Sequence, residues 1–139
     1  MTVHLLRPAV GIESTDHLFE SFERRTRPGP PPGVFITTRN VPRRQDELAD
    51  GGSVYWIIKG QIRARSPVQR VEELEDDKGK RFCHIWLEPK PRLTVPQPRR
   101  PMQGWRYLKP EDAPADLPEG EDGEMPAEMA AELKDLGLL

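Results

Sequence analysis

The segment Ser53-Val54-Tyr55-Trp56-Ile57-Ile58 decides the fold class, because it is the most hydrophobic stretch of the chain. Five successive apolar residues leave no polar face, which predicts a strand that is buried on both sides. We therefore expect Trp56 and Ile58, or Tyr55 and Ile57, to be almost fully buried. Glycines bound the segment at positions 51, 52 and 60, which favours a turn at each end.

Beyond this strand the hydrophobic pattern alternates with the period of a β-strand. Ile62 and Ala64 are expected on one face, and Arg63 and Arg65 on the other. Segments 68–75 and 80–87 then flank Asp76-Asp77-Lys78-Gly79, whose residue types favour a turn, so they predict a hairpin. Prolines next to segments 92–95 and 103–108 are typical of edge strands, where no ladder amide is needed.

The N-terminal third predicts a strand at Val3–Leu6 and a helix from Ser14 to Arg25. Arg27–Gly33 is rich in Pro and Gly and predicts a stiff exposed loop. A second strand is expected at Val34–Thr38, followed by a helical turn at Arg43–Ala49.

The C-terminal part predicts one helical turn at Pro110–Leu117, a mobile acidic linker at Pro118–Glu124 and a final helix from Pro126 to Leu136. We expect one α+β domain over residues 1–117, with residues 118–139 as linker and short helix. Proline accounts for 16 of 139 residues, which argues against a helical bundle. The fold class is α+β: a mixed, mostly antiparallel sheet of five to seven strands, strongly curved or closed as a small barrel, with two or three short helices covering its ends.

The net charge of −2 conceals a division between a basic body and an acidic tail. Residues 110–139 hold ten acids and one base, a net charge of −9, whereas residues 1–109 hold 20 bases and 13 acids, a net charge of +7. Such a tail either stays solvated or competes with an anionic ligand for the basic surface.

Cellular location and catalysis are constrained by what the sequence lacks. No apolar run is long enough for a membrane span, we recognise no secretory signal, and a single cysteine forms no internal disulfide, so we expect a cytoplasmic protein without membrane contact. Cys83 and His84 are adjacent on a predicted strand and point to opposite faces, so they form no nucleophile–base pair. Without metal-ligand spacings or nucleotide-binding loops, we expect no metal, no cofactor and no catalytic residue, and an enzyme is the less favoured class.

Two long strings carry a resemblance to a known family. Thr37-Thr38-Arg39-Asn40-Val41-Pro42-Arg43-Arg44, continuing through Asp50-Gly51-Gly52-Ser53 to Arg65, and the block from Gln103-Gly104-Trp105-Arg106-Tyr107 to Leu117 resemble an uncharacterised bacterial family, the domain of unknown function 1489. The resemblance covers about Val3 to Leu117. It implies no activity, cofactor or catalytic residue, because none is assigned to the family.

Arginines near the central strand form the candidate ligand site. The planar guanidinium binds phosphate through two parallel hydrogen bonds, and arginine outnumbers lysine here. The alternative is that these arginines pair with Asp46, Glu47, Asp50 or the acids of 72–77. The candidate ligand-binding residues are Arg39, Arg43, Arg44, Gly51, Gly52, Ser53, Arg63, Arg65, Trp105 and Arg106.

Two features could add to this site. Gly51-Gly52-Ser53 could form a backbone nest for an anion or a plain tight turn. Phe82, His84 and Trp86 share one face of a predicted strand, and such a stripe either stacks RNA bases or is covered by a helix or the proline-rich segment.

Three functions remain open. The first is a small module that binds RNA or another phosphate-bearing ligand through an arginine-rich face. The second is a protein-interaction or assembly module, with Arg27–Gly33 and the C-terminal helix as docking elements. The third is an enzyme of unrecognised type. The oligomeric state is not indicated by the sequence.

Overall fold

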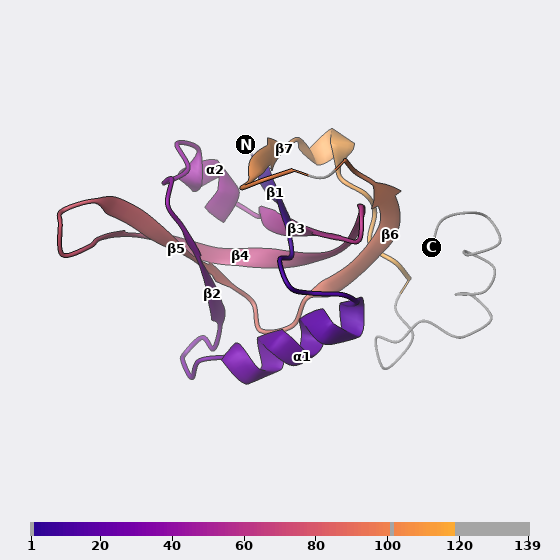
Figure 1. Cartoon of the computed structure of the whole chain (residues 1–139), viewed down its shortest axis with the longest axis horizontal. Helices are drawn as coiled ribbons and strands as arrows, with labels where there is room; N and C mark the ends of the chain where they lie inside the picture. Colours follow the sequence, from indigo (N-terminus) through magenta and orange to yellow (C-terminus); the bar gives the residue numbers. More distant parts are fainter. Residues whose placement is uncertain (1, 101, 119–139) are drawn as a thin grey trace.

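The computed structural model describes residues 2–100 and 102–118. Helical segments follow β1 and β2, and five strands then succeed one another before a final 3₁₀ turn (Figure 1). The strands are β1 (His4–Pro8), β2 (Val34–Thr38), β3 (Ser53–Ile58), β4 (Gln61–Glu75), β5 (Arg81–Leu87), β6 (Arg92–Pro98) and β7 (Arg106–Leu108). The helical segments are α1 (Thr15–Arg25), α2 (Gln45–Ala49) and the 3₁₀ turn η1 (Pro110–Asp112). The predicted α+β class is confirmed.

All seven strands join one sheet, in the order β2-β5-β4-β3-β1-β7, with β6 also paired to β4. The β1–β3 pair is parallel and the other pairs are antiparallel, as expected for a mixed, mostly antiparallel sheet. The sheet is not closed, because β2 and β7 end the strand order and no ladder joins them. Of the two expected shapes, a strongly curved sheet or a small closed barrel, the closed barrel is wrong.

Strand β4 connects two halves of the sheet. Residues 61–67 pair with β3 and residues 61–65 also with β6, whereas residues 68–75 pair with β5. The sequence predicts two separate segments here, but the chain continues as one strand of 15 residues through Pro67. The distal end forms the expected hairpin with β5, which extends away from the body of the protein (Figure 1).

A bulge at Arg63 breaks the expected alternation in β4. Trp56 pairs with Ala64, and the next residue of β3, Ile57, pairs with Ile62. One residue of β4 is therefore left without a partner between these two pairs. Consequently Ile62 and Ala64 pack into different apolar clusters instead of sharing a face. The prediction that Ile62 and Ala64 share one face, with the flanking arginines on the other, is therefore wrong, because an extra residue in one strand reverses the side-chain pattern beyond it.

The two apolar clusters fill opposite faces of β3. Val54, Trp56 and Ile58 belong to the larger cluster, and Tyr55 and Ile57 to the smaller one. All five side chains are at most 6% exposed, which confirms that β3 is buried on both faces.

Helix α1 covers the face of the sheet that carries the larger cluster. Its predicted cap is present, since Ser14 Oγ accepts a hydrogen bond from the His17 amide at 3.1 Å. Leu18 and Phe22 are buried against the sheet, and the Phe22 ring meets Trp56 edge-on with 6.1 Å between centroids. Figure 1 shows α1 lying along the sheet beside β2.

The helical turn expected at Pro110–Leu117 is present only over Pro110–Asp112, as η1, and Asp116 instead forms an antiparallel bridge with Thr94. The expected mobile linker beyond Pro118 and the final helix at 126–136 lie outside the described residues. The division into residues 1–117 and 118–139 therefore stays a prediction. No helix in the described part of the chain is long and apolar enough to cross a membrane.

Candidate ligand-binding surfaces

The predicted arginine site is not gathered around one pocket. Arg65 pairs across the sheet with Tyr55, Tyr55 with Leu6, and Leu6 with Arg106. The two arginines therefore lie on one face but are separated by two intervening strands, about 14 Å at the usual strand spacing. Ligand binding by Arg63 and Arg106 stays a prediction.

Arg65 is held in a polar network rather than free for a ligand. Its Nε and Nη2 donate to the two carboxylate oxygens of Asp116 at 2.7 and 2.8 Å, and its Nη1 donates to Ser53 Oγ at 2.8 Å. This bidentate pair raises the pKa of Arg65 and lowers the pKa of Asp116. The expected alternative, pairing with an acid, is correct for Arg65, although Asp116 is not among the acids that the sequence suggests.

The same network includes two buried rings. His4 Nδ1 accepts a hydrogen bond from the Ser53 amide at 3.0 Å, and the His4 ring meets Tyr55 edge-on with 5.0 Å between centroids. Burial, and secondarily the charge of Arg65, lowers the pKa of His4. Burial also raises the pKa of Tyr55. Ser53 is fully buried and its hydroxyl accepts a hydrogen bond from Arg65. The network of His4, Ser53, Tyr55, Arg65 and Asp116 is therefore structural in character.

The Gly51-Gly52-Ser53 segment forms a tight turn whose amides are used inside the protein. The Gly52 amide donates to the Leu48 carbonyl at 2.9 Å, and the Ser53 amide donates to His4. Gly51 has a φ of +79°, and a Cβ on Gly52 would collide with backbone carbonyl oxygens of Leu48 and Val3. Two of the three amides of the predicted nest are therefore not free for an anion.

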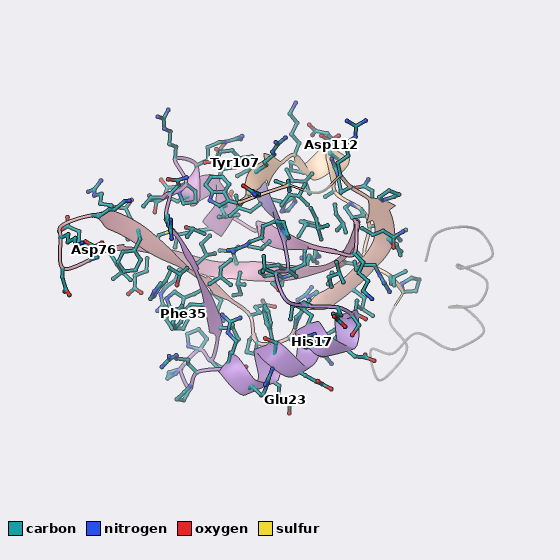
Figure 2. All side chains as sticks on the ribbon, in the orientation of Figure 1. His17, Glu23, Phe35, Asp76, Tyr107 and Asp112 are labelled. Carbon is teal, nitrogen blue, oxygen red and sulfur yellow. The ribbon has the colours of Figure 1, made fainter. Side chains whose placement is uncertain are left out.

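A second group of predicted residues meets where α2 and β7 come together. The Arg44 amide donates to the Tyr107 hydroxyl at 3.0 Å, and the Arg44 guanidinium lies 5.4 Å from the centre of the Tyr107 ring. Arg44 also forms an ion pair with Glu47, as the alternative expects. Trp105 meets Tyr107 edge-on with 5.1 Å between ring centroids, and Tyr107, labelled in Figure 2, belongs to β7. Arg39 and Arg43 are exposed, and their contact with a ligand stays a prediction.

Cys83 and His84 point to opposite faces, as the sequence predicts. Cys83 is buried in the core, where its thiol contacts Thr38 Oγ1 at 2.7 Å and burial raises its pKa. His84 stacks on Phe35 on the other side of the sheet. Within the described residues, no group of three or more His, Cys, Asp and Glu side chains is arranged to hold a metal ion.

The outer face of β2 and β5 carries a continuous row of rings, which we call the aromatic face (Phe35, Phe82, His84 and Trp86). Phe35 stacks on His84 with 4.1 Å between centroids, and lies 5.2 Å from Trp86. Phe82 meets His84 edge-on at 5.6 Å. All four side chains are only partly buried, whereas residues 83, 85 and 87 on the opposite face of β5 are fully buried.

Arginines flank the aromatic face. The Arg27 guanidinium lies 5.2 Å from the centre of the Phe35 ring, and that of Arg70 lies 4.5 Å from the centre of the Trp86 ring. Phe35 also borders an open hollow of about 420 Å³ that is lined by Arg24, Arg25 and Arg27 together with Thr26 and Pro28. Figure 2 places Phe35 beside α1, where this hollow lies.

Sequence reasoning missed this second set of arginines. Arg24 and Arg25 lie at the end of the predicted helix, and Arg27 begins the predicted proline-rich loop. The signal available was the density of arginine in the run Arg24-Arg25-Thr26-Arg27, which a six-residue Pro/Gly segment separates from the strand that begins Val34-Phe35. Their meeting with Phe35 depends on how α1 docks beside β2, which local sequence does not reveal.

Comparison with known proteins gives a family and no activity. A family model described as "Protein of unknown function (DUF1489)" matches residues 5–139. The match covers almost the whole chain, so the chain belongs to this family. No curated protein and no solved structure matches it.

Proposed function

We propose that this member of the DUF1489 family binds single-stranded RNA, with bases stacked on the aromatic face and phosphates held by the surrounding arginines. The observation that carries the proposal is the meeting, at Phe35, of partly exposed stacked rings with guanidinium groups that have no carboxylate partner among the described residues. The site differs from the arginine set that the sequence suggests, but the ligand chemistry is the same.

The rings supply a stacking surface. Phe35, His84 and Trp86 stand in contact across two hydrogen-bonded strands, so their positions are fixed before any ligand arrives. A base that stacks on a preordered ring contributes about 1–3 kcal/mol to binding. The bases of a duplex are already stacked on each other, so a surface of this kind favours a single strand.

The cations supply phosphate contacts. Among the described residues, no carboxylate lies within ion-pair distance of Arg24, Arg25, Arg27 or Arg70. Arg25 Nη2 donates to the Phe35 carbonyl at 2.8 Å, which ties the helix end to β2. Guanidinium groups without a protein counter-charge remain free to pair with phosphate oxygens.

Acidic side chains mark the limit of the surface. Glu72 accepts a hydrogen bond from Trp86 Nε1 at 3.3 Å and lies 3.7 Å from His84 Nδ1. The hairpin turn beyond it contains Asp76 and Asp77. We therefore place the RNA phosphates toward Arg27 and the hollow rather than toward the hairpin tip, because the aspartates of the tip would repel them.

Fluorescence anisotropy with a labelled 12-mer of uridylate tests the proposal. We expect binding at low salt that weakens linearly on a log–log plot as salt rises, because counterions are released from the RNA. Trp86→Leu should weaken binding by about 1–3 kcal/mol, whereas Phe19→Leu, a half-buried ring on α1, should not. Arg27→Gln should reduce the salt slope by about one unit, with Arg100→Gln as the matched exposed control.

The alternatives are separated by the same titration. A labelled 12-mer of deoxyuridylate is titrated in parallel, and if this DNA strand binds equally well, the surface is assigned to single strands in general, since the 2′-hydroxyl distinguishes RNA. If neither oligonucleotide binds at tens of micromolar, the proposal fails and the protein-interaction module becomes the leading function. A pull-down of protein partners is then the next experiment.

A further inference from the structure

A second cavity shares Arg25 with the hollow at Phe35, but most of its apolar lining belongs to the larger apolar cluster on the core side of the sheet. It is a cleft of about 210 Å³ between β1, the loop that follows it, α1 and β2. Its polar lining is Arg7, Ser21, Arg25 and Thr37, and its apolar lining includes Phe22 and Trp56. The cleft therefore joins two cations and two hydroxyl groups to an apolar wall.

Arg7 is held in this cleft by its position in the sheet. It pairs with Trp56 on the neighbouring strand β3, and its guanidinium lies 5.8 Å from the centre of the Trp56 ring. Its Nη1 is fully buried and has no hydrogen-bond partner among the described residues. Burying a charged donor without a partner costs free energy, so the chain maintains this arrangement against its own stability.

Arg25 brings a second positive charge to the same place. Burial, and secondarily the positive charge of Arg25, lower the pKa of Arg7, because both make its charged form less favourable. Neither arginine has an ion-pair partner within residues 2–100 and 102–118. Converging guanidinium groups with unfilled donors are suited to bidentate recognition of an acidic group.

We propose that this cleft binds a small organic anion, with its acidic group on Arg7 and Arg25 and a compact apolar group against Phe22 and Trp56. Carboxylates and phosphate monoesters share the geometry that two guanidinium groups recognise. The cavity is smaller than the usual 300–1,000 Å³ of sites for drug-sized ligands, which restricts the apolar group to about the size of one ring. The cleft shares only Arg25 with the hollow assigned to RNA, and it does not depend on RNA binding.

The test uses the full-length protein and the indole Nε1–H signal of Trp56 in ¹H–¹⁵N spectra. This group donates to Ser66 Oγ at 2.8 Å, so it reports on movement of the ring without contacting the ligand through its nitrogen. Phenyl phosphate and benzoate are titrated separately, with benzyl alcohol as the neutral analogue. We expect a saturable shift with at least one anion, at least about tenfold tighter than with benzyl alcohol, a difference of about 1.4 kcal/mol. The tighter of the two anions identifies the acidic group.

Two results overturn the proposal. One is the absence of a saturable Trp56 shift with both anions up to about 10 mM, a concentration well above the binding constants of specific sites. The other is equal affinity for benzyl alcohol, which assigns the cleft to apolar ligands and leaves the arginines without a role.

Arg7→Met gives a second, independent measurement. It keeps a long apolar stem over Trp56 but removes the charge, so anion affinity should fall at least about tenfold while the midpoint of thermal unfolding stays equal or rises. Arg25→Gln changes an exposed residue at the end of α1 and should also weaken anion binding. It is the substitute test should Arg7→Met fail to fold. Arg100→Gln is the control that leaves anion affinity unchanged. Wild-type affinity in both Arg7→Met and Arg25→Gln would contradict the assignment.

Discussion

The guanidinium of Arg7 lies over the ring of Trp56, 5.8 Å from its centre, in the larger apolar cluster of the protein. The two residues are register partners on the parallel strands β1 and β3. Trp56 therefore has two roles: its ring is part of the core packing between sheet and helix, and it is also one wall of a cationic cleft.

Replacement of Trp56 by alanine should lower the free energy of unfolding by about 3–5 kcal/mol, because it removes a ring that is packed against Phe22. Urea denaturation followed by circular dichroism measures the change. A loss below about 1 kcal/mol would mean that β3 does not form the centre of the core.

Asp116→Asn should remove stability that depends on the ion pair with Arg65. The pKa of Asp116 is lowered in the folded state, so this stability is present above the ordinary pKa of about 3.9 and is lost as pH falls through the folded value. Because the Asp116 side chain is 41% exposed, we expect only about 0.5–1 kcal/mol at pH 7. Urea midpoints of wild type and variant should converge as pH falls below the ordinary pKa of about 3.9 toward the lowered folded value, and a constant gap across the acid range would contradict this account.

His4 should make the protein less stable as pH falls below neutrality. Its folded pKa is lowered by burial, so below the ordinary pKa of about 6.5 the unfolded chain binds a proton that the folded chain does not. The resulting loss of stability begins near pH 6.5 and ends at the folded pKa. The thermal midpoint of wild type should fall between about pH 7 and 5. His4→Asn, which retains an acceptor near the Ser53 amide, should show a flatter profile over the same range.

Neutralising acids in the tail should strengthen RNA binding at low salt. Residues 110–139 carry a net charge of −9 and residues 1–109 a net charge of +7, so we expect the tail to compete electrostatically with a polyanion. The full-length variant with Glu119→Gln, Glu121→Gln, Asp122→Asn and Glu124→Gln tests this by anisotropy. The gain should disappear at about 0.5 M salt, where the Debye length is only a few ångströms. A variant that binds no more tightly than wild type at low salt would leave the tail without a regulatory role.

Local patterns were sufficient for most elements of this fold. The apolar run of β3, the Ser14 cap of α1 and the turn around Asp76 each depend on neighbours in sequence, and the structure contains all three. The bulge at Arg63 was not predictable in this way, because it depends on the pairing of β4 with β3.

The functional surfaces were harder to foresee, because they depend on contacts between distant segments. The partner of Arg65, Asp116, is 51 residues away in sequence. The meeting of Arg7 with Arg25 requires α1 to fold back on β1 and β2, which no periodicity in the sequence specifies. The aromatic stripe of β5 was visible in the sequence, but its extension by Phe35 required the β2–β5 register.

The most direct test of RNA binding by the aromatic face uses the three indole Nε1–H signals in ¹H–¹⁵N spectra during titration with the uridylate 12-mer. Trp86 lies in the proposed surface, Trp56 is buried in the core, and Trp105 packs against Tyr107 near β7. We predict that the Trp86 signal shifts in a saturable manner while the Trp105 signal stays in place. An unchanged Trp86 signal at saturating RNA, or a larger shift at Trp105, would contradict the account and move the binding surface to the arginines near β7.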